Sequence, residues 1–62
     1  MLAENIKEIR EEKRMTQGEV AKKMGTSQAS ISAYENGKKD PTYRTLCRLA
    51  NVLECTVVDL VK

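Results

Sequence analysis

One short segment combines a glutamine with small, uncharged side chains on a single helical face. Residues 28–35 have the pattern of a helix, in which Ile31 and Tyr34 point to one side at about 100° per residue. The opposite side carries no charge and consists of Gln28, Ala29, Ser32 and Ala33. A glutamine amide pairs with N6 and N7 of adenine together, and an alanine suits contact with a thymine methyl. This face predicts contact with base edges; the alternative is a weakly polar face exposed to solvent.

The elements that must position this face are two short helices joined by a tight turn. Thr16 is a helix N-cap, and Glu19 three residues later completes a capping box. Gly25 stands where the first helix needs a residue that tolerates positive φ, and Ser27 caps the second helix, which ends at Asn36-Gly37. The first helix aligns three apolar residues on one face: Val20, Ala21 and Met24. Helix, glycine turn and helix is the arrangement that places its second helix in the DNA major groove.

The remaining segments also predict helices, and no stretch alternates like a strand. A first helix spans Leu2 to Lys13, and Met15 precedes the Thr16 cap as a hydrophobic staple. Thr42 caps a helix to about Leu53, and Thr56 with Asp59 forms a second capping box that starts a short last helix. The apolar stripes of these three helices contain Leu2, Ile6, Ile9, Leu46, Leu49, Ala50, Leu53, Val57, Leu60 and Val61. We expect residues 1–62 to form one all-α domain of five helices.

Composition bounds the function classes. With 40% hydrophobic and 32% charged residues, the chain is globular rather than disordered. A net charge of +2 is too small to indicate a nucleic-acid partner by itself. No apolar run approaches the roughly 20 residues of a membrane span, and no signal-peptide core is present. We therefore expect a cytoplasmic protein without a membrane partner.

Catalytic and metal-binding residues are scarce. The chain has no histidine, which removes the commonest general base and metal ligand. Cys47 and Cys55 are eight residues apart, which fits no paired-cysteine metal site, and both are expected to be buried, reduced thiols. No glycine-rich phosphate loop is present. The sequence therefore predicts neither an enzyme nor a bound metal or cofactor.

The segment from Gln17 to Gly37 resembles the helix-turn-helix of the phage repressor/Cro family, also called the xenobiotic-response-element family of bacterial regulators. The resemblance covers nearly the whole chain, through Pro41, Leu46, Leu49-Ala50, Leu53 and Thr56 to Leu60. It implies a compact five-helix, repressor-like domain that binds double-stranded DNA in a sequence-specific way and represses transcription. Such a protein is bacterial or phage-encoded, and it is nucleoid-associated when bound to DNA.

The resemblance also implies residue roles. Base edges are expected to be read by Ser27, Gln28 and Ala29, with Ser32 and Ala33 further along the groove. Contacts to the DNA backbone are expected from Gln17, Ser30, Asn36 and Lys38, and also from Lys39 and Arg44. In the family, an arginine matching Arg10 pairs with a glutamate matching Glu35 beside the DNA. Here that pair is either a structural salt bridge or a means for Arg10 to contact a phosphate.

Three positions depart from the family pattern. Gly18 lies in the first turn of a helix, where glycine costs stability relative to alanine. Ala29 replaces a second glutamine of close relatives, so their operators do not transfer to this chain. Glu54 occupies a position where glycine, asparagine or aspartate usually ends the fourth helix, and a change in that turn is expected.

The sequence leaves alternatives for the binding partner and for the oligomeric state. A weak homodimer would read an inverted repeat with half-sites about 34–36 Å apart, and Val58 and Val61 are candidate dimer contacts or simply exposed valines. The competing function is a protein-binding module of the same fold, antitoxin-like or coactivator-like, with DNA binding secondary. The absence of acidic residues between Gln28 and Tyr34 favours DNA. Non-specific DNA binding would need more positive charge than +2.

Overall fold

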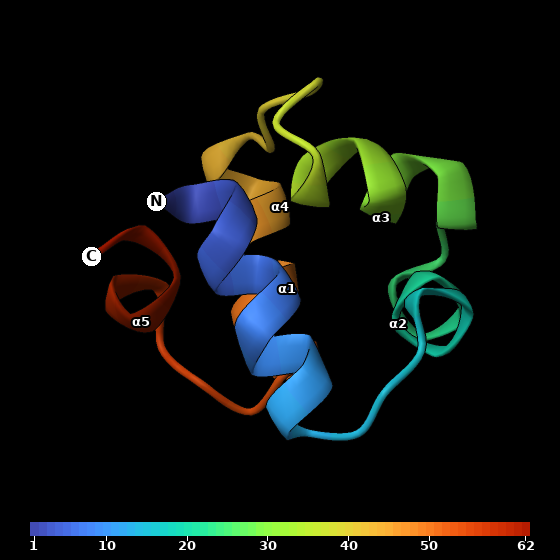
Figure 1. Ribbon diagram of the computed structural model, residues 1–62. Coiled ribbons are helices and arrows are strands. Elements are labelled where there is room, and N and C mark those ends of the chain that lie inside the picture. The colour runs from blue at the N-terminus through green and yellow to red at the C-terminus, as the bar shows by residue number, and fades with distance from the viewer.

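Side-chain caps set where most of the helices begin. The computed structural model describes residues 1–62 and contains five helices and no strand (Figure 1). In chain order these are α1 (Leu2–Glu12), α2 (Gln17–Met24), α3 (Gln28–Glu35), α4 (Tyr43–Val52) and α5 (Val57–Val61). The predicted all-α fold and the predicted order of elements are confirmed, and α1 ends one residue earlier than predicted.

Two capping boxes are formed as the sequence predicts. The hydroxyl of Thr16 accepts from the backbone N–H of Glu19 (3.0 Å), and the Glu19 carboxylate accepts from the N–H of Thr16 (2.8 Å). Thr56 and Asp59 repeat the exchange at α5, over 3.1 and 2.9 Å. Each pair satisfies two backbone donors that would otherwise have no partner, so these boxes fix where α2 and α5 start.

Left-handed residues follow four helices, including Gly37 after α3 at φ +72°. Gly25 closes α2 at φ +72°, as predicted. Glu54 follows α4 at φ +56°. The expected change in this turn is wrong, because the N–H of Cys55 still reaches the carbonyl of Ala50 (2.9 Å) and closes the usual C-terminal motif. Arg14 takes the same conformation after α1 at φ +57°, and no residue type at this position predicted it.

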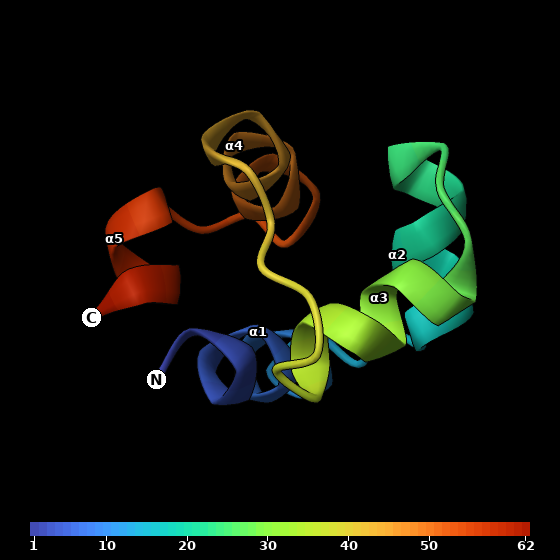
Figure 2. The ribbon, with the colours of Figure 1, turned by 90° about the horizontal axis from the view of Figure 1, so that it is seen from above.

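The core is aliphatic apart from one tyrosine. Its buried members come from every helix: Ile6, Val20, Ala21, Ile31, Tyr34, Leu49, Ala50, Leu53 and Leu60. Figures 1 and 2 place α5 and both chain ends on one side of the molecule, with α2 on the opposite side. The side-chain amide of Asn5 joins the two ends by donating to the carbonyls of Leu60 and Lys62, each over 2.9 Å. The longest helix has 11 residues, and none of the five could cross a bilayer.

The two cysteines differ in exposure. Cys55 is half-buried, and burial raises the pKa of its thiol. Cys47 is exposed, so its predicted burial is wrong. The physical reason is the register of α4, in which Leu49 and Ala50 face the core and Cys47 lies on the solvent side, one turn after the exposed Tyr43.

Candidate nucleic-acid interface

Helix α3 shows its uncharged side to solvent. Ile31 and Tyr34 are buried against the rest of the domain, as the helical period predicts. On the other side, Gln28 and Ala29 are exposed, whereas Ser32 and Ala33 are half-buried. The accessible part of this face therefore lies at the N-terminal end of α3, and it carries one amide and one methyl group.

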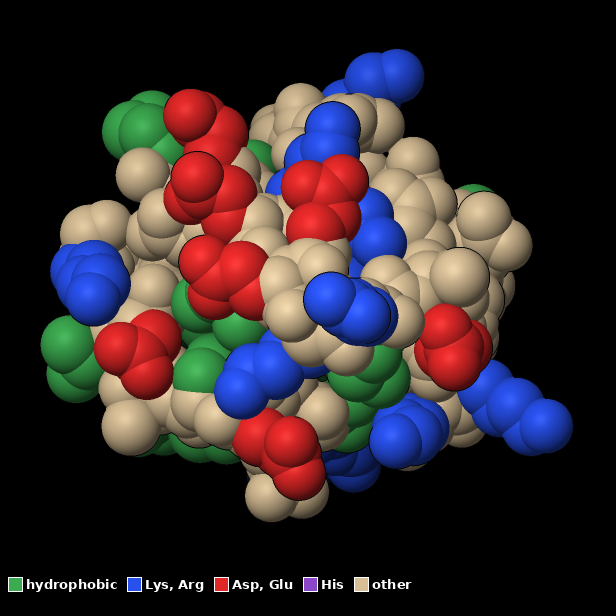
Figure 3. All heavy atoms as spheres, turned by 60° about the horizontal axis from the view of Figure 1, so that its bottom comes forward, with side chains coloured by type: hydrophobic (Ala, Val, Ile, Leu, Met, Phe, Trp, Pro, Cys, Tyr) green, Lys and Arg blue, Asp and Glu red, His purple; other side chains and the backbone are tan.

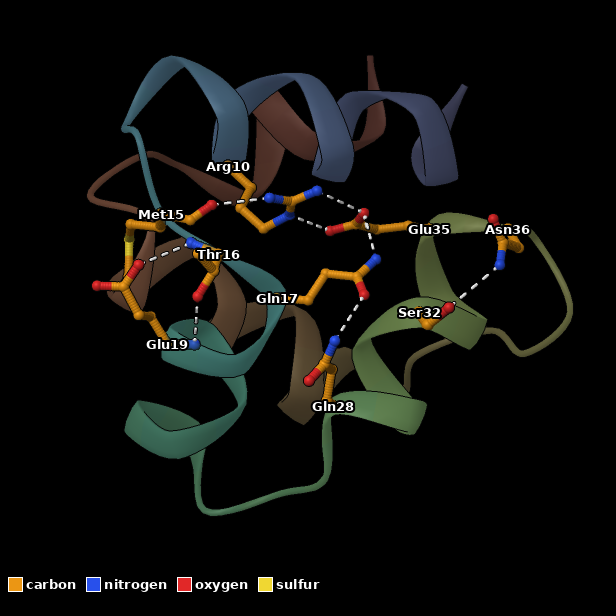
Figure 4. Close-up of polar contacts among 9 residues, drawn as sticks. All are labelled: Arg10, Met15, Thr16, Gln17, Glu19, Gln28, Ser32, Glu35 and Asn36. Carbon is orange, nitrogen blue, oxygen red and sulfur yellow. Dashed lines mark hydrogen bonds and ion pairs between the residues drawn. The ribbon is translucent and has the colours of Figure 1, made fainter.

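A chain of hydrogen bonds connects Gln28 to the protein interior (Figure 4). The Gln28 amide donates to Oε1 of Gln17 (3.5 Å), and the Gln17 amide donates to Oε1 of Glu35 (3.1 Å). Glu35 in turn accepts from Nε and Nη2 of Arg10, over 2.6 and 3.0 Å. Helices α1, α2 and α3 each contribute to this chain, which we call the amide relay: Arg10, Glu35, Gln17 and Gln28.

The inner half of the amide relay is a bidentate ion pair away from water. The side chains of Arg10 and Glu35 are only 11% and 1% exposed. The hydrogen bond to Glu35 raises the pKa of Arg10 although burial acts against this. Nη1 of Arg10 donates to the carbonyl of Met15 (2.7 Å), so all three guanidinium nitrogens donate within the protein. Three of the five guanidinium N–H groups are thus used within the protein, and the Arg10 side chain is only 11% exposed, which favours the structural alternative for the pair.

The hydroxyl residues of α3 are engaged with one another or with the backbone. Ser27 caps the helix by accepting from the N–H of Ser30 (3.1 Å), and the two hydroxyls lie 3.1 Å apart. Ser32 accepts from the side-chain amide of Asn36 (3.2 Å). The bond joins Ser32, which was expected to contact a base, to Asn36, which was expected to contact the DNA backbone. Both residues lie at the C-terminal end of α3.

Three expected backbone contacts are cations outside α3. Lys38 and Arg44 are exposed, and neither forms an ion pair. The ammonium of Lys39 lies 5.6 Å from the centre of the Tyr34 ring, within the range of a cation–π contact. The loop that carries both lysines is held to α3, because their backbone N–H groups donate to the carbonyl of Ala33 (3.0 and 3.3 Å).

Gly18 lies beside the outer end of the amide relay. A Cβ at this position would meet Oε1 of Gln28 at 3.7 Å and the Thr16 hydroxyl at 3.8 Å, both ordinary contacts. The φ of Gly18 is not positive either. The fold therefore does not require glycine here, and nothing in the structure explains why alanine is absent.

The connection between Gln17 and Gln28 is the feature that sequence reasoning missed. Gln17 was expected only as a backbone contact, because no spacing rule relates residues on two different helices. The usable signal was the helix-turn-helix itself, which packs α2 against α3. No group of three or more potential metal ligands is brought together anywhere in the domain.

Comparison with known proteins agrees with this geometry. The family model HTH_3, described as helix-turn-helix, matches residues 6–60. The chain belongs to this family. It has the five helices of a phage repressor/Cro-type domain, and α2 and α3 form its helix-turn-helix.

Two curated relatives and one solved structure are informative. The chain is 37% identical to the uncharacterized HTH-type transcriptional regulator YqaE of Bacillus subtilis over its whole length, but it spans about half (53%) of that protein. It is 38% identical to antitoxin HipB of Escherichia coli K12, over 90% of this chain and 64% of HipB. The crystal structure of SinR, a master regulator of biofilm formation, in complex with DNA superposes with a TM-score of 0.92 at 28% identity, covering both chains completely.

Proposed function

We propose that this chain is a sequence-specific binder of double-stranded DNA and acts as a transcriptional regulator, as a repressor. The observation that carries the proposal is the exposed, uncharged face of α3, whose Gln28 is connected by the amide relay to a buried ion pair. A base-reading side chain needs a defined position before DNA arrives, since ordering it on binding costs free energy. The likeness to the DNA-bound structure of SinR supports the same conclusion.

The base-reading set lies along α3. Gln28 and Ala29 are the most accessible members, and they suit an adenine edge and a thymine methyl. The Ser27 oxygen caps the helix, and its hydroxyl can donate to a base when Ser30 acts as the donor in the contact between the two hydroxyls. Ser32 and Ala33 would reach bases only where the groove approaches closely, because both are half-buried.

The backbone-contacting set comes from α2, α3, the loop after α3 and the start of α4. Gln17 lies at the N-terminus of α2, where the helix dipole favours a phosphate. Ser30 and Asn36 flank the reading face, and Lys38, Lys39 and Arg44 supply positive charge. Arg10 is assigned a positioning role, because its guanidinium is bonded to Glu35 and to the carbonyl of Met15 and its side chain is only 11% exposed.

A weak homodimer would allow the domain to read two half-sites. Helix α5 exposes Val58 (66%) and Val61 (50%), and Met1 is 81% exposed. Burying such side chains between two copies is favourable, at roughly 25 cal/mol per Å² of apolar surface. The operator would then be an inverted repeat with half-sites about 34–36 Å apart.

This activity is binding rather than catalysis, and it needs no cofactor. The carboxylates outside the amide relay and the capping boxes lie on solvated faces. We place the protein in the cytoplasm, because the DNA that it binds is located there. When it is bound to DNA, it is associated with the nucleoid.

The test is selection of bound duplexes from a random DNA library at near-physiological salt. We expect enrichment of an inverted repeat with half-sites one helical turn apart. On the selected duplex, Gln28→Ala should lose about 1–3 kcal/mol of binding free energy and relax the preference at one A·T pair. Asn51→Ala is the matched control, since it removes an exposed amide on α4 outside the interface. Unchanged affinity and preference in Gln28→Ala would refute the assignment of α3.

The similarity to HipB favours a second candidate, a protein-binding module whose DNA binding is secondary. The same selection separates the two functions. If no sequence is enriched, and binding is absent or depends only on salt, the principal partner is a protein.

A further inference from the structure

A concave surface lies between α2 and α4, apart from the proposed DNA interface. Two adjoining hollows of about 460 and 330 Å³ share three lining residues, Lys23, Asn51 and Val52. We call these two hollows together the α2–α4 groove. None of the residues proposed to contact DNA lines it.

The α2–α4 groove contains apolar side chains that the core does not fully cover. Met15, Met24 and Val52 line it; each packs against the core cluster and yet remains half-exposed. Methionine side chains are flexible and polarizable, so they adapt to apolar groups of different shape. This part of the groove could therefore accept aliphatic or aromatic side chains from a partner.

The sides of the α2–α4 groove are basic. Lys13, Lys23 and Arg48 line it, whereas Glu54 is its one acidic residue. The three cations form no ion pair, since the only ion pairs in the protein are Arg10–Glu35 and Lys62–Asp59. The groove thus has positive charges that are available to carboxylates from outside.

The neighbouring hollow has the opposite character. It measures about 400 Å³ and lies between α1 and α5, and its four acidic lining residues, Glu8, Glu12, Glu54 and Asp59, outnumber its two lysines, Lys13 and Lys62. Lys13 and Glu54 lie on the border and line both hollows. In Figure 3 most acidic side chains lie on the left half of the face, whereas several basic ones lie at its lower right, with apolar atoms emerging between them; single charges of the other sign occur on each side. An acidic ligand would be repelled from the α1–α5 side and attracted to the α2–α4 side.

We propose that the α2–α4 groove binds an acidic peptide segment of a partner protein. The segment would place apolar side chains against Met15, Met24 and Val52 and carboxylates against Lys13, Lys23 and Arg48, in the manner of an amphipathic helix in a groove. A peptide fits better than a nucleic-acid backbone because phosphates would use the cations but leave the apolar side chains uncovered. This inference does not depend on the DNA-binding function, because the two surfaces share no residue.

The experiment is a titration of isotope-labelled protein, followed by amide NMR shifts. The probe is a synthetic amphipathic peptide with leucine and phenylalanine on one helical face and aspartate and glutamate on the other. We expect saturable shifts at Lys23, Met24 and Val52 and none at Gln28 or Ala29. Two matched peptides serve as controls: one with serine for every apolar residue, and one with lysine for every acidic residue. Both should bind at least tenfold more weakly.

A protein variant tests the same surface. Lys23→Glu combined with Arg48→Glu reverses two exposed charges, so the domain should stay folded by circular dichroism while peptide affinity falls about tenfold or more. Absence of groove shifts with the acidic peptide, or equal binding by the lysine peptide, would overturn the proposal. So would groove shifts produced by duplex DNA together with loss of DNA binding in the charge-reversed variant, which would make the groove part of the nucleic-acid interface.

Discussion

The side-chain amide of Gln28 donates to Oε1 of Gln17 over 3.5 Å, across the turn between α2 and α3. This distance is at the long limit for a hydrogen bond, so the contact orients Gln28 without holding it tightly. The next bond inward, from Gln17 to Glu35, is 3.1 Å, and the ion pair behind it is shorter still. The hydrogen bonds of the amide relay therefore become shorter from the surface towards the interior. This suits a Gln28 side chain that must reorient onto a base while Gln17 and Glu35 stay in place.

Removing Gln17 should weaken base reading as well as backbone contact. In Gln17→Ala, Gln28 loses its oriented partner, so discrimination at the A·T pair should fall along with affinity for the selected duplex. A double-mutant cycle with Gln28→Ala, measured by fluorescence anisotropy, should give a coupling of about 0.5–3 kcal/mol. Strict additivity would show that the two glutamines act independently.

Breaking the Arg10–Glu35 pair should cost much of the stability of so small a domain. Glu35→Ala leaves a buried guanidinium without its partner, a change typically worth about 3–5 kcal/mol in unfolding free energy. The double variant Arg10→Met/Glu35→Leu should unfold at a urea concentration much nearer that of wild type. It should nevertheless discriminate its operator poorly, because Gln17 has lost its acceptor. Retained discrimination in this variant would show that the amide relay is structural only.

Acid should destabilise the fold through the two capping boxes. Hydrogen bonds from Thr16 lower the pKa of Glu19 from its ordinary 4.5, and those from Thr56 lower the pKa of Asp59 from 3.8. Since the folded values lie below the unfolded ones, both carboxylates stabilise the fold above their ordinary pKa values, and this contribution is lost as pH falls through the lowered ones. The Tm should therefore fall on acidification below about pH 4.5. Glu19→Gln should show a shallower decline.

The left-handed conformation of Glu54 should be relieved by glycine. At φ +56° a Cβ is unfavourable, so Glu54→Gly should raise the unfolding free energy by about 0.5–1 kcal/mol and the Tm by a few degrees. Glu54→Ala is the control, because it removes the same carboxylate but keeps a Cβ. Equal effects of both substitutions on the Tm would mean that charge rather than backbone conformation is responsible.

The two loop lysines should differ in their contribution to DNA binding. Lys38 is exposed and has no partner, so Lys38→Ala should weaken all duplexes alike and reduce the salt slope by about one. Lys39 lies over the Tyr34 ring, so Lys39→Ala should change the salt slope less and lower the Tm slightly. Affinity measured over a range of salt concentrations distinguishes the two.

The sequence by itself determined most of the fold, because its signals are local. Capping boxes at Thr16 and Thr56, the turn glycine Gly25 and the helical spacing of Ile31 and Tyr34 act within a few residues of the chain. Each was therefore predictable without knowledge of any neighbouring helix. The uncharged face that begins at Gln28 was predictable for the same reason.

Only the tertiary structure decided how these elements meet. Arg10, Gln17, Gln28 and Glu35 lie on three helices, and their hydrogen bonds depend on packing that no local pattern encodes. The exposure of Cys47 likewise depends on which side of α4 faces the core, and the α2–α4 groove exists only because two helix ends distant in sequence lie together. Local rules fix each helix, whereas long-range packing fixes which side chains become neighbours.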